Sequence, residues 1–123
     1  MNFVNFTNHP SESWSEEQIK AAEAYGEIID LPFPNVDSEA TEEDIEKLGS
    51  EFVEKIENLN PSAVLCQGEF TLCYFVIAQL QKRGITVLSA CSKRMVKERL
   101  SLDGQKEKVS TFQFVRFRNY FKI

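Results

Sequence analysis

Four stretches of apolar residues along the chain each run into a short polar cluster, at residues 3–9, 27–34, 63–69 and 85–94. Short apolar runs bounded by polar residues are typical of strands rather than helices. The run at residues 63–67 is apolar on both faces, which indicates a central strand of a parallel sheet. Four parallel strands would place their polar clusters at one edge of one sheet, the edge at which open α/β sheets bind ligands.

Helical patterns separate the predicted strands. Ser15 and Gln18 form a capping-box sequence ahead of a short helix, and Thr41 with Asp44 marks the start of a longer amphipathic helix. Residues 70–83 are apolar nearly all round, so one side of this helix is expected to pack on the sheet and the other on a further surface. A second copy of the chain is the candidate for that surface, and a homodimer is therefore expected.

The alternation of strands and helices predicts an α/β fold: a three-layer sandwich with a Rossmann-like, mainly parallel sheet of about five strands. The first strand is expected beside the third, with the second outside the first, so that the winding direction reverses between the first and third strands. Residues 93–110 are charged and predict a mobile excursion or a short hairpin, with a turn at Asp103 and Gly104. Residues 111–117 alternate phenylalanine with polar residues, which predicts an added C-terminal edge strand.

Composition narrows the class of protein. A length of 123 residues suits a single Rossmann-like domain, 1–123, and 42% hydrophobic with 27% charged residues is ordinary for a soluble globular protein. The longest apolar-rich run is too short to span a bilayer, and no signal peptide is evident. The three cysteines lack metal-like spacing. A reduced, cytoplasmic protein without membrane association is expected.

The net charge of −5 hides an asymmetry along the chain. Residues 1–81 hold three basic and 16 acidic side chains, a net charge of −13, whereas residues 82–123 hold 11 basic and three acidic ones, a net charge of +8. The acidic part would repel a polyanion, so long duplex nucleic acid is not an expected partner. A small phosphate-bearing ligand on the basic part and two solvated faces of opposite charge both agree with this pattern.

His9 is the only histidine, and it follows Asn8 just past the end of the first predicted strand. Histidine is the side chain that most readily exchanges protons near neutral pH, so His9 is the best candidate for a general acid or base. The alternative is that residues 8–10 only form a turn that leaves His9 in solvent. Pro34 and Asn35 follow the second predicted strand and are expected at the same edge of the sheet.

Gln67, Gly68 and Glu69 form a second candidate cluster, just before the apolar helix. Gly68 permits a close approach of the backbone, and the first N–H groups of the helix, that of Thr71 among them, point toward its start. The Rossmann and P-loop glycine fingerprints are absent, and the charge of Glu69 disfavours a simple phosphate cradle. A hydrogen bond between Glu69 or Gln67 and a ribose hydroxyl or base edge fits better. The alternative is that Glu69 only complements the helix dipole.

Ser92, Lys93 and Arg94 end the fourth predicted strand and would bring positive charge to the same edge, where an arginine fork suits phosphate oxygens. A solvated basic loop is the alternative. One histidine, dispersed cysteines and no tight carboxylate cluster do not make a metal site. Neither a metal nor another cofactor is therefore expected.

Together these short elements resemble the small CRISPR-associated Rossmann-fold-like proteins of the ring-nuclease type, which act in antiviral defence. The elements that carry the resemblance are Asn8-His9, Trp14-Ser15, Gln18, residues 31–34, Gln67-Gly68-Glu69, Thr71-Leu72 and Ser92-Lys93-Arg94. In that family a homodimer binds a cyclic oligoadenylate second messenger across its two-fold axis, and some members cleave it without metal. The resemblance implies that the messenger is surrounded by Asn8, His9, Gln67, Glu69, Ser92 and Arg94.

Metal-free cleavage needs the neighbouring 2′-hydroxyl aligned with the phosphorus and hydrogen-bond donors on the developing charge. The candidate catalytic residues are His9 and Glu69. The candidate ligand contacts are Asn8, Gln67, Gly68, Thr71, Ser92, Lys93 and Arg94. Two alternatives remain: a non-catalytic sensor of a nucleotide or other small ligand, and a protein-interaction module that docks through the apolar helix or the phenylalanine-rich last strand.

Overall fold

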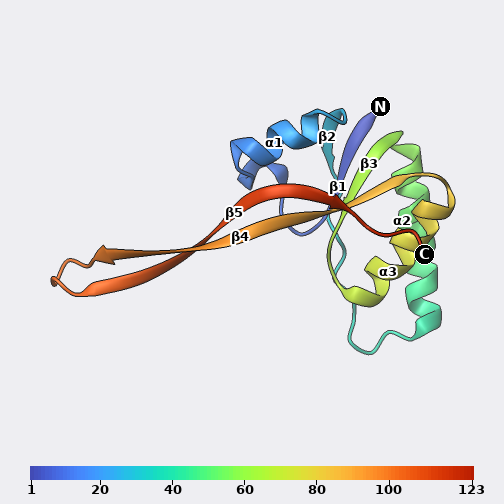
Figure 1. Ribbon diagram of the computed structural model, residues 1–123. Helices are drawn as coiled ribbons and strands as arrows, with labels where there is room; N and C mark the ends of the chain where they lie inside the picture. Colours follow the sequence, from blue (N-terminus) through green and yellow to red (C-terminus); the bar gives the residue numbers. More distant parts are fainter.

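The computed structural model describes residues 1–123 as a five-stranded mixed sheet with three α-helices (Figure 1). The strands are β1 (Asn2–Phe6), β2 (Glu27–Asp30), β3 (Pro61–Cys66), β4 (Thr86–Leu100) and β5 (Lys106–Asn119). The helices are α1 (Glu16–Glu23), α2 (Glu42–Asn58) and α3 (Phe70–Lys82), with a short 3-10 helix at Ser11–Ser13. The predicted α/β class is confirmed.

The strand order in the sheet is β2-β1-β3-β4-β5. β1 pairs in parallel with β2 and β3, β3 pairs in parallel with β4, and β5 runs antiparallel to β4 at the edge. The predicted position of β1 between β2 and β3 is confirmed, and so is the added C-terminal strand at the edge of the sheet. The chain moves outward from β1 to β2 and then crosses back to β3, so the winding reverses between β1 and β3.

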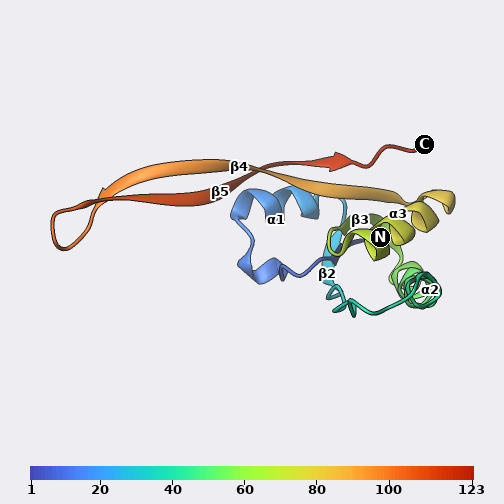
Figure 2. The same cartoon turned by 90° about the horizontal axis from the view of Figure 1, so that it is seen from below.

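Side chains of the central strands fill two hydrophobic clusters because successive residues of a strand point to opposite faces. One face packs against α2 and α3, and its strand residues include Val4, Phe6, Val64, Cys66 and Val87. The other face packs against Ala22 of α1, and its strand residues include Phe3, Ala63, Leu65 and Leu88. In Figure 2, α1 lies apart from α2 and α3, in agreement with these two separate clusters.

The two predicted helix starts are confirmed. Ser15 caps α1, with its hydroxyl accepting a hydrogen bond from the Gln18 N–H at 3.2 Å. Thr41 and Asp44 form a reciprocal capping box at the start of α2, with bonds of 2.9 and 3.2 Å. The backbone N–H of Thr41, followed by its hydroxyl, lowers the pKa of Asp44 because both bonds favour the charged carboxylate.

The hairpin of β4 and β5 is much longer than the sequence predicts. The fourth strand is predicted to end at Ser92, Lys93 and Arg94, but β4 runs unbroken to Leu100 and pairs with β5 along its length. We call residues 92–115 the arm; it starts at a bulge next to Cys91 and projects far from the rest of the molecule, which we call the body (Figures 1 and 2). Of the two alternatives predicted for residues 93–110, the hairpin with its turn agrees with the structure and the mobile excursion does not; the predicted short length is wrong.

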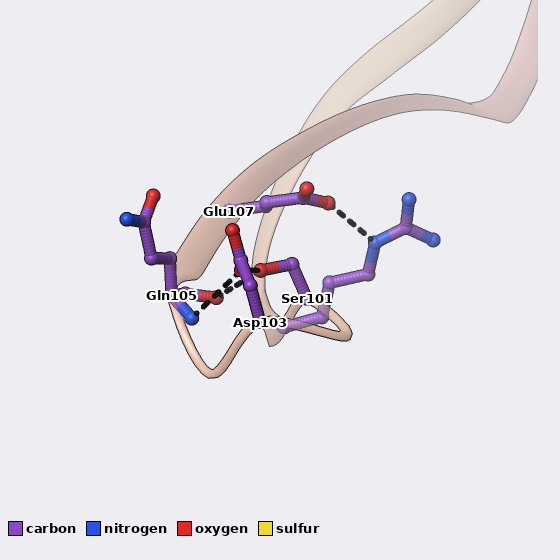
Figure 3. Close-up of polar contacts among 5 residues, drawn as sticks. Ser101, Asp103, Gln105 and Glu107 are labelled. Carbon is purple, nitrogen blue, oxygen red and sulfur yellow. Dashed lines mark hydrogen bonds and ion pairs between the residues drawn. The ribbon is translucent and has the colours of Figure 1, made fainter.

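The tip of the arm is closed by local hydrogen bonds (Figure 3). Gly104 has a φ of +83°, which a glycine adopts without strain, in agreement with the predicted turn. Asp103 accepts hydrogen bonds from the Ser101 hydroxyl and, at 3.2 Å, from the Gln105 N–H. These two groups lower the pKa of Asp103, the Ser101 hydroxyl more strongly. The tip is thus ordered by its own residues and by no contact with the body.

α3 leaves part of its apolar surface uncovered. Leu72, Val76 and Leu80 are fully buried, whereas Phe70 and Tyr74 are 89% and 78% exposed. The expectation of a helix that is apolar beyond its buried face therefore agrees with the structure, while the second copy that would cover it stays a prediction. No helix of the chain is both long and apolar enough to cross a lipid bilayer.

Candidate functional site

A buried polar network fixes the carboxyl end of β1. Asn5 and Thr7 are the two buried polar side chains of the chain, 1% and 5% exposed. The Asn5 amide donates to Asp30 Oδ1 at 2.8 Å and to the His9 carbonyl at 2.9 Å, and the Thr7 hydroxyl donates to Asn5 Oδ1 at 2.8 Å. Because an unmet buried polar group is costly, this network holds the loop after β1 in one conformation.

Asp30 and Trp14 extend this network to the surface. Asp30, the last residue of β2, accepts from the backbone N–H and the hydroxyl of Ser11. The Trp14 indole donates to the His9 carbonyl at 3.0 Å. The backbone of His9 is therefore firmly held, while its imidazole is exposed to solvent. This is the arrangement needed to present a side chain at a defined place on the edge of the sheet.

Glu69 is the N-cap of α3. Its carboxylate accepts from the Leu72 N–H at 2.8 Å, from the Thr71 N–H at 2.9 Å and from the Thr71 hydroxyl at 2.7 Å. The bond from Leu72, followed by the hydroxyl and the N–H of Thr71, lowers the pKa of Glu69. The start of α3 is thus satisfied by the chain's own carboxylate, which agrees with the expectation that Glu69 argues against a phosphate cradle here.

Gln67 and Gly68 have structural roles in this arrangement. The Gln67 side-chain oxygen accepts from the Ala90 N–H at 2.9 Å and so ties the end of β3 to β4. A Cβ atom at Gly68 would lie 2.6 Å from ring carbons of Phe33, so the close approach of this ring requires glycine. The tight backbone approach predicted for Gly68 thus involves Phe33 and leaves the backbone there covered.

Three strand ends meet around a hollow of about 360 Å³ at the carboxyl edge of the sheet. It is lined by Asn8, Phe33, Pro34, Asn35, Val36 and Glu69. Asn8 follows β1, residues 33–36 follow β2, and Glu69 follows β3. The predicted meeting of Asn8, Asn35 and Glu69 at one edge therefore agrees with the structure. The hollow offers two amides, one carboxylate and an apolar wall, which suit hydroxyl groups and base edges better than phosphate.

The basic cluster lies apart from this hollow. Because β4 continues past the sheet, Ser92, Lys93 and Arg94 lie inside a strand of the arm, and the prediction that they end the strand is wrong. At about 3.3 Å per residue, Arg94 is roughly 20 Å beyond Leu88, the last β4 residue paired with β3. Its guanidinium donates to the Ser110 hydroxyl across the hairpin at 2.9 Å.

Two cysteines also lie behind the start of α3. The thiols of Cys66 and Cys73 are 3.4 Å apart and buried. The hydrogen bond with Cys73, together with burial, raises the pKa of Cys66. Tyr120 donates to the Cys66 carbonyl at 2.8 Å, and burial raises the pKa of Tyr120 to about 12. No three His, Cys, Asp or Glu side chains lie close enough together to hold a metal ion.

The family model described as Uncharacterized protein MJ1673 family matches residues 1–118. The chain belongs to the MJ1673 family. No curated protein and no solved structure matches the chain. The match runs through the whole arm as well as the hollow, so both features lie within the part of the chain that the MJ1673 family model describes.

The sequence pattern did not single out four residues that shape this region: Asn5, Thr7, Asp30 and Phe33. Asn5 carried a usable signal, because it is an amide between the apolar residues Val4 and Phe6 of a strand and therefore needs a buried partner. Its partner Asp30 ends a neighbouring strand and follows from the predicted strand order. Phe33 carried no such signal, since its packing on Gly68 depends on the path of an irregular segment.

Proposed function

We propose that this protein binds a cyclic oligoadenylate second messenger in the hollow at the carboxyl edge of its sheet, as a homodimer in the cytoplasm. The observation that carries the proposal is the convergence of Asn8, Asn35 and Glu69 from three separate strand ends. These strand ends lie where the winding of the sheet reverses, the usual ligand position in open α/β sheets. A role in CRISPR-associated antiviral defence, and the Rossmann-like three-layer classification of the fold, belong to the same proposal.

The side chains that line the hollow suit the base and the ribose of the ligand better than its phosphates. The Asn8 and Asn35 amides can each donate to and accept from an adenine edge, and Phe33 and Pro34 offer an apolar surface for the base. Glu69 has lone pairs left beyond its bonds to the helix start and accepts from a ribose hydroxyl. The phosphates then face outward from the hollow, while Ser92, Lys93 and Arg94 lie apart from them on the arm.

Metal-free cleavage of the same ligand is the second candidate, and the fixed position of His9 favours it. The Asn5 and Trp14 bonds hold the His9 backbone next to Asn8, so its exposed imidazole adjoins the proposed ligand. His9 would serve as general acid or base while the ribose 2′-hydroxyl attacks the phosphorus. Glu69 suits binding better than proton transfer, because the hydrogen bonds that lower its pKa also weaken it as a base.

Calorimetric titration with a panel of cyclic oligoadenylates tests the binding proposal. We expect one ring size to bind and Asn8→Ala to weaken it by roughly tenfold, since it removes hydrogen bonds worth about 1–1.5 kcal/mol. Asn58→Ala is the matched control, because Asn58 ends α2 at the opposite edge of the sheet. No heat with any ring, or equal affinity of the two variants, would contradict the proposal.

Single-turnover mass spectrometry separates cleavage from binding. If His9 transfers a proton, His9→Ala slows cleavage by ~10²–10⁴-fold while the affinity changes little. Unchanged cleavage in that variant would remove His9 from the mechanism. A ligand that stays intact with the unmutated protein would leave a sensor that binds without chemistry.

A further inference from the structure

One face of the arm carries an apolar stripe that nothing in the chain covers. In an antiparallel ladder, paired residues share a face, and so do alternate residues of one strand. The pairings Ser92–Phe114 and Arg94–Phe112 therefore place both phenylalanines on the face that also holds Val96 and Leu100. These four apolar residues are the stripe; the same face carries the charged side chains of Arg94, Glu98, Lys106 and Lys108. Phe112, Val96 and Leu100 are 75%, 56% and 71% exposed.

This stripe continues the core of the body outward. Phe114 contacts Phe117 with their ring centroids 5.0 Å apart, and Phe117 packs against the hydrophobic cluster beneath α1. Beyond α1 the stripe has no partner in the chain (Figure 2). A two-stranded ribbon is marginally stable in water on its own, so an exposed stripe of this length indicates a surface that is covered in the working protein.

The arm is also basic, whereas the body is acidic. Residues 92–115 hold six basic and three acidic side chains, a net charge of +3. The helix α2 alone holds seven acidic and two basic ones, a net charge of −5. The charge favours the body of another copy over a second arm as the partner of the arm, because two arms would bring like charges together.

Three hollows of the body combine apolar and acidic residues: the proposed ligand site, a groove of about 320 Å³ at the start of α2, and a groove that alone adds the exposed ring of Tyr74. The third is the candidate for docking the arm. It lies between α2 and α3, has a volume of about 430 Å³ and is lined by Ile45, Phe75, Ala78, Tyr74, Glu42 and Glu46, among others. A larger groove of about 680 Å³ on the other side of Tyr74 carries Lys82 and Lys122, which would repel the arm. The α2–α3 groove is therefore the surface that matches the stripe in both polarity and charge.

We propose that the arm of each protomer docks its apolar stripe in the α2–α3 groove of a second copy, so that two copies exchange arms. From Ser92 to Leu100 the arm is about 26 Å long at 3.3 Å per residue, close to the diameter of a small domain. Because exchange forms the arm–groove contact twice, each contact needs to bury only about 600–1,000 Å² of surface. The two together then reach the ~1,200–2,000 Å² of buried surface typical of a stable complex.

This inference specifies the surface of the homodimer named in the proposed function, but it requires no ligand. Sedimentation velocity of the ligand-free protein therefore tests it separately from the calorimetric titration. At micromolar concentration we expect twice the chain mass of 14.1 kDa. A protein that stays monomeric would overturn the arm exchange while leaving ligand binding to be judged by its own titration.

Two matched variants of the arm locate the surface. Phe112→Lys places a charge on the stripe and should raise the dimer dissociation constant at least about tenfold, as expected for an apolar anchor. Thr111→Lys adds the same charge on the opposite face, where Thr111 pairs with Met95, and should change it by less than about twofold. Both residues are exposed, so thermal unfolding should confirm that each variant is folded. Equal effects of the two variants would overturn the proposal.

The groove is tested by Tyr74→Lys, which should also weaken the dimer at least about tenfold. A mixture of Phe112→Lys and Tyr74→Lys chains should then form a heterodimer, detectable with a mass tag on one chain. In this heterodimer the intact arm of the Tyr74→Lys chain meets the intact groove of the Phe112→Lys chain. An undisturbed dimer with Tyr74→Lys would show that arms pair with arms, and the absence of heterodimer recovery would likewise overturn reciprocal exchange.

Discussion

Neighbouring strands are stabilised by different interactions in the body and in the arm. In the body, β1 and β3 are buried on both faces, and Phe6 packs against Phe33 and Phe52 with ring centroids 4.7 and 5.1 Å apart. In the arm, β4 and β5 are held by their backbone ladder and by surface pairs such as Arg99–Glu107 at 3.3 Å. Exposed ion pairs contribute little, so the arm lacks the burial that stabilises the body.

The body and the arm therefore differ in the source of their stability. The body is stabilised because its own residues bury the apolar side chains of the central strands and of the inner faces of its helices. The arm exposes most of its side chains, and its local opening should cost far less than global unfolding. The two regions should therefore respond differently to the same chemical change.

The largest expected contrast is between two leucines. Leu72 in α3 is fully buried, whereas Leu102 at the tip of the arm is fully exposed. Leu72→Ala should lower the free energy of unfolding by about 2–5 kcal/mol, because it removes buried methyl groups and leaves a cavity. Leu102→Ala should change it by less than about 0.5 kcal/mol. Urea unfolding of both variants checks this, and a comparable loss in both would mean that the arm unfolds together with the body.

The same contrast explains how much of the fold the sequence predicts. The central strand at residues 63–66 and the capped starts at Ser15 and Thr41 were predictable, because burial and capping leave periodic or fixed-spacing signals. In the arm, only the turn at Asp103 and Gly104 and the alternation at residues 111–117 left such signals. Both faces of the ribbon are exposed in the chain, so Lys93, Arg94 and Lys97 occur where a half-buried strand would show alternation. The sequence of residues 93–110 therefore predicts only a mobile excursion or a short hairpin.

The candidate site was predictable to a similar degree. The strand order brought Asn8, Asn35 and Glu69 to one edge, because parallel strands have their carboxyl ends on the same side. The position of Arg94 was not predictable, since it depends on where β4 ends. The use of Gln67 as a tie to Ala90 and of Glu69 as a cap depends on side-chain directions that spacing alone does not determine.

A smaller contrast is expected between two hydroxyl caps. Thr41→Ala removes the cap of α2 and should lower the free energy of unfolding by about 0.5–2 kcal/mol. Ser101→Ala removes the hydroxyl that bonds to Asp103 and to the Gln105 carbonyl at the arm tip. Its effect should be confined to faster hydrogen exchange at Gly104 and Gln105, with global unfolding unchanged. Loss of global stability in Ser101→Ala would show that the arm is cooperative with the body.

The smallest expected contrast concerns acid. Hydrogen bonds lower the pKa of both Glu69 and Asp103, yet only Glu69 caps an element of the body. A carboxyl whose pKa is lowered on folding stabilises the protein above its unfolded pKa, 4.5 for Glu69, and this contribution is lost as the pH falls through the folded value. Unfolding of Glu69→Gln should therefore depend less on pH below 4.5 than that of the unmutated protein.

Asp103→Asn should leave this dependence unchanged, because its bonds are broken when the arm tip opens, before the body unfolds. Urea midpoints between pH 3 and 6 (a range about the ordinary carboxyl values) measure both, and an equal flattening in the two variants would place the arm tip in the same cooperative unit as α3.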